Sequence, residues 1–206
     1  MGRKEAVRVH DLLWISKDTE LFSLGQPAWV RDVLTRSSVV VVRRADAPPG
    51  FIAVGIRGSS RGQRHAAFLR KADVLAYRTP ESLAAEQVWH EASAALPLPL
   101  LGALKMVGEF SRRNHLVWGP IGSVGYQLAT GMPAASVASD LDLIIRCDEL
   151  LSHTCLQALH AIQAGPVRLD VILEGPRGAV ALEEYLQDRP ALIKTVRGPR
   201  IAAFTW

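Results

Sequence analysis

Three aspartates that lie within apolar segments are candidate functional residues, because of their type and spacing. Asp140 and Asp142 begin the run DLDLIIR, and Asp170 interrupts the run VRLDVIL. Residues i and i+2 of a strand project to the same side, so Asp140 and Asp142 are predicted to lie side by side. Neighbouring carboxylates repel each other, and a carboxylate among apolar side chains is costly to bury without a partner. A cation that prefers oxygen ligands, Mg²⁺ or Mn²⁺, would offset both costs, while a solvated strand end is the alternative interpretation of the Asp140–Asp142 pair.

A glycine-rich turn precedes these carboxylates. The segment Gly119–Gly125 reads GPIGSVG and stands between the apolar run HLVW and a helical pattern. Such a turn directs backbone N–H groups at a helix start, together with the Ser123 hydroxyl, toward one point, which suits a phosphate group. Turns with Gly and Ser are also common in proteins that bind no phosphate, so this motif is informative only jointly with Asp140, Asp142 and Asp170. Together they predict a two-metal phosphoryl-transfer site.

The hydrophobic pattern predicts the helices and strands on which these residues lie. The run 39–42 is VVVV and is predicted to form a hairpin with 51–56 across the turn 45–50, ADAPPG. Thr79 and Pro80 have the composition of a helix start and mark a predicted domain boundary. Beyond it strands and helices alternate, which predicts an α/β domain with a mixed or parallel sheet. The predicted helices are 81–95, 100–111, 122–130, 148–164 and 180–187, and the predicted strands are 115–118, 141–145, 167–173 and 191–196.

The two predicted domains, residues 1–80 and 81–206, differ in charge. The first contains 14 Lys or Arg and 7 Asp or Glu, whereas the second contains 10 and 13. This asymmetry predicts a small, basic, β-rich N-terminal domain that binds a substrate or partner, followed by a catalytic domain. A polar, glycine-rich loop is predicted over 57–65, and its cations suit substrate phosphates or an acidic carrier protein, with a solvated loop as the alternative. These cations are Arg57, Arg61 and Arg64.

Composition excludes several classes of protein. The chain is 49% hydrophobic and 21% charged, as in an ordinary globular protein, so disorder is not its main state. The sequence contains no run of 18 apolar residues, so it predicts no transmembrane helix, and the N-terminus lacks the apolar core of a signal peptide. Cys147 and Cys155 are too few for a disulfide framework or a four-cysteine zinc site, which predicts two reduced thiols in a cytoplasmic protein.

The candidate site residues resemble the signature of a known fold family. Gly122–Ser123, the Asp140-x-Asp142 pair and the later Asp170 are similar to the motifs of the nucleotidyltransferase fold, the DNA polymerase β-like superfamily. Ser123 and Asp140 are 17 positions apart, farther than in its most compact members. The longer segments WGPIGSVGYQLATGMPAASVASDLDLIIR and RLDVILEGPRGAVALEEYLQDRPALIKTVRGPRIA resemble the phosphoribosyl-dephospho-CoA transferases of malonate decarboxylase, which are holo-acyl-carrier-protein synthases. The front of the chain, with GIRGSSRGQRHAAFL and RTPESL, is similar as well, so the resemblance covers nearly the whole chain.

This resemblance implies a particular reaction. Such enzymes move a phosphoribosyl-dephospho-CoA group from 2′-(5″-triphosphoribosyl)-3′-dephospho-CoA to a serine of the apo acyl-carrier subunit, and pyrophosphate is released. By the resemblance, Asp140 and Asp142 hold Mg²⁺ or Mn²⁺ against the triphosphate, and Asp170 either completes a second metal site or takes the proton of the serine. Gly122 and Ser123 would contact the β and γ phosphates. In the C-terminal segment LIKTVRGPR, the resemblance implies two further phosphate contacts, Lys194 and Arg197. The alternative interpretation of this segment is a solvated basic tail.

Two other functions are compatible with the same residues. One is a different nucleotidyltransferase that uses the metal site to modify a small molecule or another protein. The other is a non-enzymatic nucleic-acid-binding module, suggested by the basic N-terminal domain. The five tryptophans are scattered and form no stacking platform for bases, and three uncompensated carboxylates would repel a polyanion.

Overall fold

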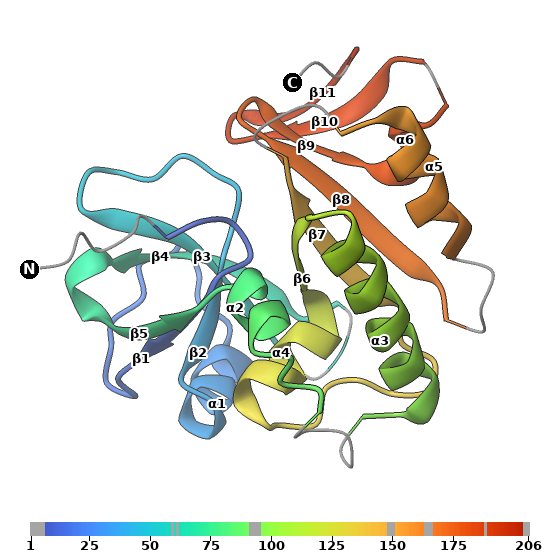
Figure 1. The fold of residues 1–206 in the computed structure, drawn as a ribbon. Coiled ribbons are helices and arrows are strands. Elements are labelled where there is room, and N and C mark those ends of the chain that lie inside the picture. Colours follow the sequence, from blue (N-terminus) through green and yellow to red (C-terminus); the bar gives the residue numbers. More distant parts are fainter. Residues whose placement is uncertain are drawn as a thin grey trace, which may run out of the picture. The chain divides into compact units, whose positions relative to one another are not determined.

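The chain folds into two units, each with its own sheet. The computed structural model describes residues 7–58, 60, 62–90, 96–147, 151–162, 167–187 and 189–203 (Figure 1). The two compact units are Met1–Thr79 and Pro80–Trp206. Each unit has one β-sheet and one hydrophobic core, and the described part of the chain includes six α-helices. The protein is therefore a mixed α/β protein with two sheets.

The first unit is a five-stranded antiparallel sheet with one α-helix. The strand order is β4-β3-β2-β1-β5, and every described pair of neighbours is antiparallel. The four valines of β2 suit a buried strand because β-branched side chains pack well on a pleated surface. Val30 and Leu34 of α1 pack into the same core. The elements are β1 (Leu12–Ile15), α1 (Ala28–Arg36), β2 (Val39–Val42), β3 (Phe51–Arg57), β4 (Arg64–Arg70) and β5 (Val74–Arg78), with a 3₁₀ turn at Lys71–Asp73.

The hairpin predicted from the valine run is confirmed, because β2 and β3 pair antiparallel. The predicted loop 57–65 is too long at both ends. Arg57 is the last residue of β3 and Arg64 is the first residue of β4, and the two are register partners. Pairing reaches this far because the Gly58 N–H donates to the Gln63 carbonyl at 2.8 Å, which closes the turn.

The second unit is built on a mixed six-stranded sheet, as the sequence predicted. Its strand order is β11-β10-β9-β8-β7-β6; β7 and β8 are parallel, and the other described pairs are antiparallel. No described helix is both long and apolar enough to cross a membrane. The elements are α2 (Pro80–Ala85), α3 (Leu98–Arg113), β6 (Val117–Pro120), α4 (Gly122–Thr130), β7 (Leu141–Arg146), α5 (His153–Ala161), β8 (Leu169–Gly175), β9 (Gly178–Ala181), α6 (Leu182–Tyr185), β10 (Ala191–Thr195) and β11 (Gly198–Ala202).

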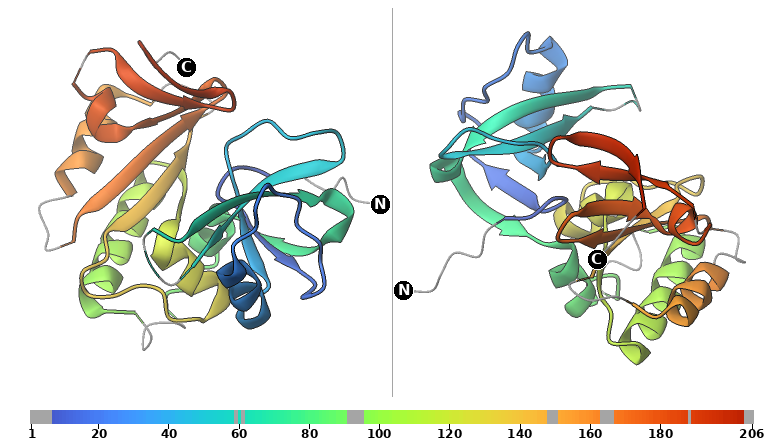
Figure 2. Two further views of the ribbon diagram at one scale, coloured as in Figure 1. Left: turned by 180° about the vertical axis from the view of Figure 1, so that it is seen from behind. Right: turned by 90° about the horizontal axis from the view of Figure 1, so that it is seen from above.

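The two faces of this second sheet differ in chemistry because side chains alternate along each strand. One face packs against leucines of α3, α5 and α6 in the main core of the unit (Figures 1 and 2). We call the opposite face the aspartate face, because both strand aspartates project from it. The core-facing residues of β7 and β8 are Leu141, Leu143, Ile145, Leu169, Val171 and Leu173, and those on the aspartate face are Asp142, Ile144, Arg146, Asp170, Ile172 and Glu174.

Two predicted helices of the second unit are shorter than expected. The helix predicted over 81–95 ends at Ala85 as α2, and 91–95 lie outside the described residues. The helix predicted over 148–164 is described only as α5. It begins at His153 because the Ser152 hydroxyl accepts a hydrogen bond from the Cys155 N–H at 3.2 Å and caps it. The ends of that prediction, 148–150 and 163–164, are also outside the described residues.

The C-terminal region contains more strand than predicted. The helix predicted over 180–187 is wrong at its start, because the turn after β8 returns the chain and Val180 pairs with Leu173 within β9. Sheet pairing here overrides the helical pattern, and α6 keeps only Leu182–Tyr185. The segment LIKTVRGPR, for which a solvated tail was the alternative, belongs to a β-hairpin: it covers most of β10 and the first residues of β11, and these strands pair at five successive positions.

Candidate functional site

Asp142 and Asp170 lie next to each other on neighbouring strands. In the parallel pair of β7 and β8, Asp142 is the register partner of Asp170. Neighbouring strands are about 4.8 Å apart, so both carboxylates leave the sheet at the same place. Asp142 is half-buried and Asp170 is exposed; Asp140 is exposed and immediately precedes β7. The two strands that carry aspartates are therefore neighbours in the sheet.

The glycine-rich turn brings the start of α4 against Asp142. The Ile121 N–H donates to the Asp142 carbonyl at 2.9 Å, and α4 then begins at Gly122. Gly122 has a φ of 62°, and a Cβ at this position would overlap the Oδ2 atom of Asp142. Only glycine fits here, both because of the left-handed backbone and because the carboxylate occupies the space of a side chain. Ser123 follows in the first turn of α4 and is half-buried. The fold thus assembles Gly122, Ser123, Asp142 and Asp170.

This contact predicts different effects for two glycines at opposite ends of α4. Gly122→Ala and Gly131→Ala both place alanine at a positive φ, 62° and 72°, so each is expected to lower the free energy of unfolding by about 1–2 kcal/mol. Only Gly122→Ala also displaces a carboxylate, because nothing lies within 4 Å of a Cβ at Gly131. We expect Gly122→Ala alone to reduce transfer activity, roughly 100-fold or more, since a small misplacement of a catalytic group has effects of that size. Urea unfolding and steady-state kinetics of both variants check this; equal activity losses would contradict the assignment.

The donor set at this place fits a cation that arrives with a phosphate substrate. Among the described residues, no group of three or more His, Cys, Asp or Glu side chains is arranged to hold a metal ion. Mg²⁺, however, is typically held by one or two carboxylates, with phosphate oxygens and water as its other ligands. Asp142 and Asp170 supply two carboxylates of that kind, and both are oxygen donors.

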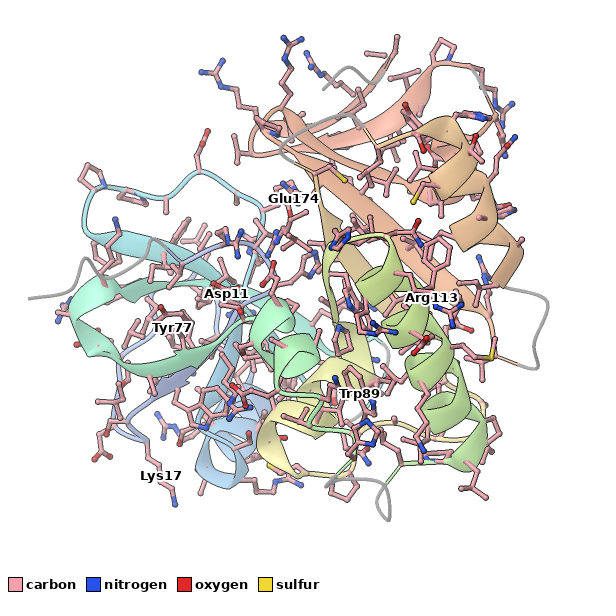
Figure 3. The ribbon with its side chains drawn as sticks, in the orientation of Figure 1. Asp11, Lys17, Tyr77, Trp89, Arg113 and Glu174 are labelled. Carbon is pink, nitrogen blue, oxygen red and sulfur yellow. The ribbon has the colours of Figure 1, made fainter. Side chains whose placement is uncertain are left out.

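A buried arginine on the aspartate face contacts two carboxylates. Arg146 of β7 contacts Glu81 of α2, with 2.6 Å between Nε and Oε1. Its Nη1 contacts Oε2 of Glu174 on β8, the residue labelled in Figure 3. The side chains are only 6%, 15% and 13% exposed for Arg146, Glu81 and Glu174. This cluster was not predicted from the sequence. Its signal was the charged residue that closes each apolar strand, Arg146 after DLDLII and Glu174 after DVIL.

Lys194 lies on the aspartate face, which the register of the sheet establishes. Lys194 pairs with Ala179 of β9, Ala179 pairs with Glu174, and Glu174 pairs with Arg146. Residues directly opposite each other on neighbouring strands project to the same side, so Lys194 shares the face of Asp170. Four residues along β8 and two strands across correspond to about 16 Å between the Cα atoms of Asp170 and Lys194. Lys194 therefore belongs to the same surface as the aspartates, at some distance from them.

The other predicted cations are placed as follows. Arg197 is exposed in the turn between β10 and β11, where its N–H donates to the Thr195 Oγ1 at 3.2 Å. Arg57 and Arg64 are exposed and directly opposite each other at the end of the β3–β4 pair of the first unit. Facing like charges are unfavourable on a sheet, so this pair would gain from an anion. Arg61 lies outside the described residues.

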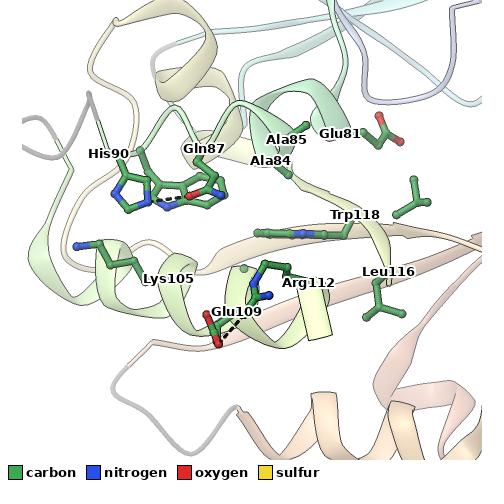
Figure 4. A pocket seen from close by; sticks show the side chains of 13 residues that line it. Glu81, Ala84, Ala85, Gln87, His90, Lys105, Glu109, Arg112, Leu116 and Trp118 are labelled. Atoms are coloured by element: carbon green, nitrogen blue, oxygen red, sulfur yellow. Dashed lines mark hydrogen bonds and ion pairs between the residues drawn. The ribbon is translucent and has the colours of Figure 1, made fainter. Parts of the chain in front are cut away.

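A cavity of about 580 Å³ lies in the second unit, and none of the residues predicted from the sequence lines it. Its lining includes Trp118, whose register partner Ile145 faces the core, and Val117, whose register partner Arg146 lies on the aspartate face, so the cavity lies at the β6 edge of the sheet. Lys105, Glu109 and Arg112 line it from α3 (Figure 4). The hydrogen bond and charge of Arg112, with the charge of Arg113, hold the pKa of Glu109 below its usual range. Glu109 is therefore ionised at neutral pH, beside the cations Lys105 and Arg112.

Comparisons with known proteins agree over both units. Residues 8–80 match the family model described as the phosphoribosyl-dephospho-CoA transferase MdcG N-terminal domain, and residues 82–204 match that of the C-terminal domain. Relatives called phosphoribosyl-dephospho-CoA transferase occur in Pseudomonas putida strain GB-1, 38% identical over 98% of this chain and 96% of the relative, and in Klebsiella pneumoniae, 36% identical over 97% and 96%. A further relative of that name, from Azotobacter vinelandii, is 38% identical over 96% of this chain and 93% of the relative. No solved structure matches the chain.

These matches define the chain first as a transferase with an N-terminal and a C-terminal domain. More specifically, it belongs to the phosphoribosyl-dephospho-CoA transferase family.

Proposed function

We propose that this protein transfers the phosphoribosyl-dephospho-CoA group from 2′-(5″-triphosphoribosyl)-3′-dephospho-CoA to a serine of the apo acyl-carrier subunit of malonate decarboxylase. The serine oxygen forms a bond to the phosphorus nearest the ribose, and the bond from that phosphorus to pyrophosphate breaks. The observation that carries the proposal is the register pairing of Asp142 with Asp170 beside the start of α4. The family supports phosphoribosyl-dephospho-CoA as the transferred group.

The residues of the site divide the work in this proposal. Asp142 and Asp170, with Asp140 beside them, are the oxygen ligands for Mg²⁺ or Mn²⁺. When bound, the metal neutralises charge that develops on the leaving pyrophosphate. Gly122 and Ser123 at the start of α4 hold the β and γ phosphates, because helix N-termini favour anions. The alternative role for Asp170, the more exposed of the paired aspartates, is to take the serine proton as a base instead of binding the metal.

The second unit is, in this proposal, a catalytic domain of the nucleotidyltransferase type. The glycine-rich turn from β6 into α4 and the two aspartates on β7 and β8 support that class. We further propose that the first unit binds substrate or partner through Arg57, Arg64 and the intervening Arg61. The like charges of Arg57 and Arg64 face each other and favour an anionic ligand.

Intact-mass analysis tests the reaction. The protein is mixed with Mg²⁺, the triphosphoribosyl donor and apo-carrier subunit, and we expect the carrier to gain one phosphoribosyl-dephospho-CoA group. EDTA should prevent the gain and added Mg²⁺ should restore it, and a carrier whose acceptor serine is alanine should stay unmodified. Release of pyrophosphate from ATP without any carrier, combined with no mass gain from the proper donor, would instead support a different nucleotidyltransferase.

A further inference from the structure

We infer that the β10–β11 hairpin is the docking surface for the acceptor protein and that it binds an acidic, partly apolar face of that protein. The inference rests on the proposed function, which requires a protein acceptor. The hairpin surface consists of Leu192, Lys194, Val196, Arg197 and Ile201.

Apolar side chains are unusually exposed on this hairpin. Leu192 is 40% exposed, Val196 50% and Ile201 75%. Leu192 and Ile201 are register partners, so they lie side by side and form one continuous patch. Exposed apolar patches with polar or charged rims are typical of protein–protein interfaces.

The cations of the hairpin surface are exposed. Neither Lys194 nor Arg197 forms an ion pair with another residue that the structure describes. Glu183 and Glu184 line a cavity together with Leu192 and Ile201, and Glu184 accepts a hydrogen bond from the Leu192 N–H at 2.7 Å, so the positive charge lies toward the turn of the hairpin. Such a surface favours an acidic partner and accelerates its association.

The hairpin is held in a defined conformation. Five successive residue pairs join β10 and β11. At the turn, the Thr195 hydroxyl donates to the Gly198 carbonyl at 2.8 Å and accepts from the Arg197 N–H at 3.2 Å. A rigid surface loses little conformational freedom on binding, which favours recognition.

The hairpin shares a face with the proposed catalytic aspartates. Lys194 projects from the aspartate face through the register described above, and Leu192, two residues earlier on the same strand, projects with it. A protein bound to the hairpin therefore extends along the surface that carries Asp170. The separation of about 16 Å between the Cα atoms of Lys194 and Asp170 puts the hairpin surface beside the aspartates on the same face.

The experiment measures binding and kinetics of a charge-reversed hairpin. The variant carries Lys194→Glu and Arg197→Glu. The matched control carries Lys17→Glu and Arg31→Glu, two exposed cations of the first unit. We expect the hairpin variant to raise the Kd for apo-carrier and the KM for carrier by roughly tenfold or more, with the donor KM unchanged. A second variant, Leu192→Ser with Ile201→Ser, should weaken carrier binding without altering its salt dependence.

The outcomes separate this inference from the proposed function. Because the Kd for apo-carrier is measured directly, it reports on docking even if the wild-type protein transfers nothing, a result that would contradict only the proposed function. A rise in donor KM with unchanged carrier binding would overturn the inference and make Lys194 and Arg197 phosphate contacts. An equal loss in the first-unit control would also overturn it, since bulk charge would then explain the effect.

Discussion

Replacing Asp142 with asparagine is expected to reduce transfer on the order of 1000-fold while the protein stays folded. Asparagine has nearly the same size but no charge, so the site loses a metal ligand and retains its packing. A metal ion that neutralises a leaving pyrophosphate contributes several kcal/mol to the transition state, and each 1.4 kcal/mol corresponds to about tenfold in rate. Intact-mass kinetics at several Mg²⁺ concentrations, with thermal unfolding of the same samples, measure both effects.

Other aspartates supply the comparison for this experiment. Asp46→Asn, in an exposed loop of the first unit, is the control and should leave activity unchanged. Asp140→Asn should abolish transfer if Asp140 is a ligand as well. Asp170→Asn separates the two roles left open for that residue: a ligand variant needs more Mg²⁺ for half-maximal activity, whereas a base variant has a lower kcat at the same Mg²⁺ requirement. Near-normal turnover of Asp142→Asn would falsify the metal assignment.

Arg146→Met is expected to lower the free energy of unfolding by about 3–5 kcal/mol. The substitution leaves Glu81 and Glu174 buried without their shared cation, and breaking a buried ion pair on one side has effects of this size. Arg112→Met is the matched control, because Arg112 also pairs with a glutamate, Glu109, but on the exposed side of α3. That variant should cost less than about 1 kcal/mol, as exposed pairs usually contribute little. Urea unfolding monitored by tryptophan fluorescence measures both.

A combined variant tests whether unpaired charge is the cause. Arg146→Met with Glu81→Gln and Glu174→Gln removes all three charges, and we expect it to recover at least half of the stability lost in Arg146→Met. Replacing every member of a buried ion cluster is often nearly neutral, because the desolvation of the charges disappears with them. If the combined variant is as unstable as Arg146→Met, packing of the arginine stem explains the loss and the electrostatic explanation is wrong.

The periodic segments were predictable because their signals are local. The valine run of β2, the alternation in DLDLIIR and the helical pattern after Gly122 each involve neighbours in sequence, and each forms the predicted element. Prediction was poorer where pairing with a distant strand competes with a local pattern. Val180 belongs to a stretch with a helical pattern, yet it pairs with Leu173 because the tight turn between them returns the chain to β8.

The candidate site residues of the second unit could be predicted from the amino-acid order: two carboxylates that alternate with leucines, a third inside another apolar strand, and a Gly-Ser turn before a helix. Their neighbours depend on the tertiary structure. The sheet pairs Asp142 with Asp170 in parallel register and sets the side on which Lys194 lies. Arg146 contacts Glu81, 65 positions away in sequence, and Glu174, 28 positions away. Alternation predicts the two faces of one strand, but which strands become neighbours, and in which register, depends on how the whole sheet buries its apolar face.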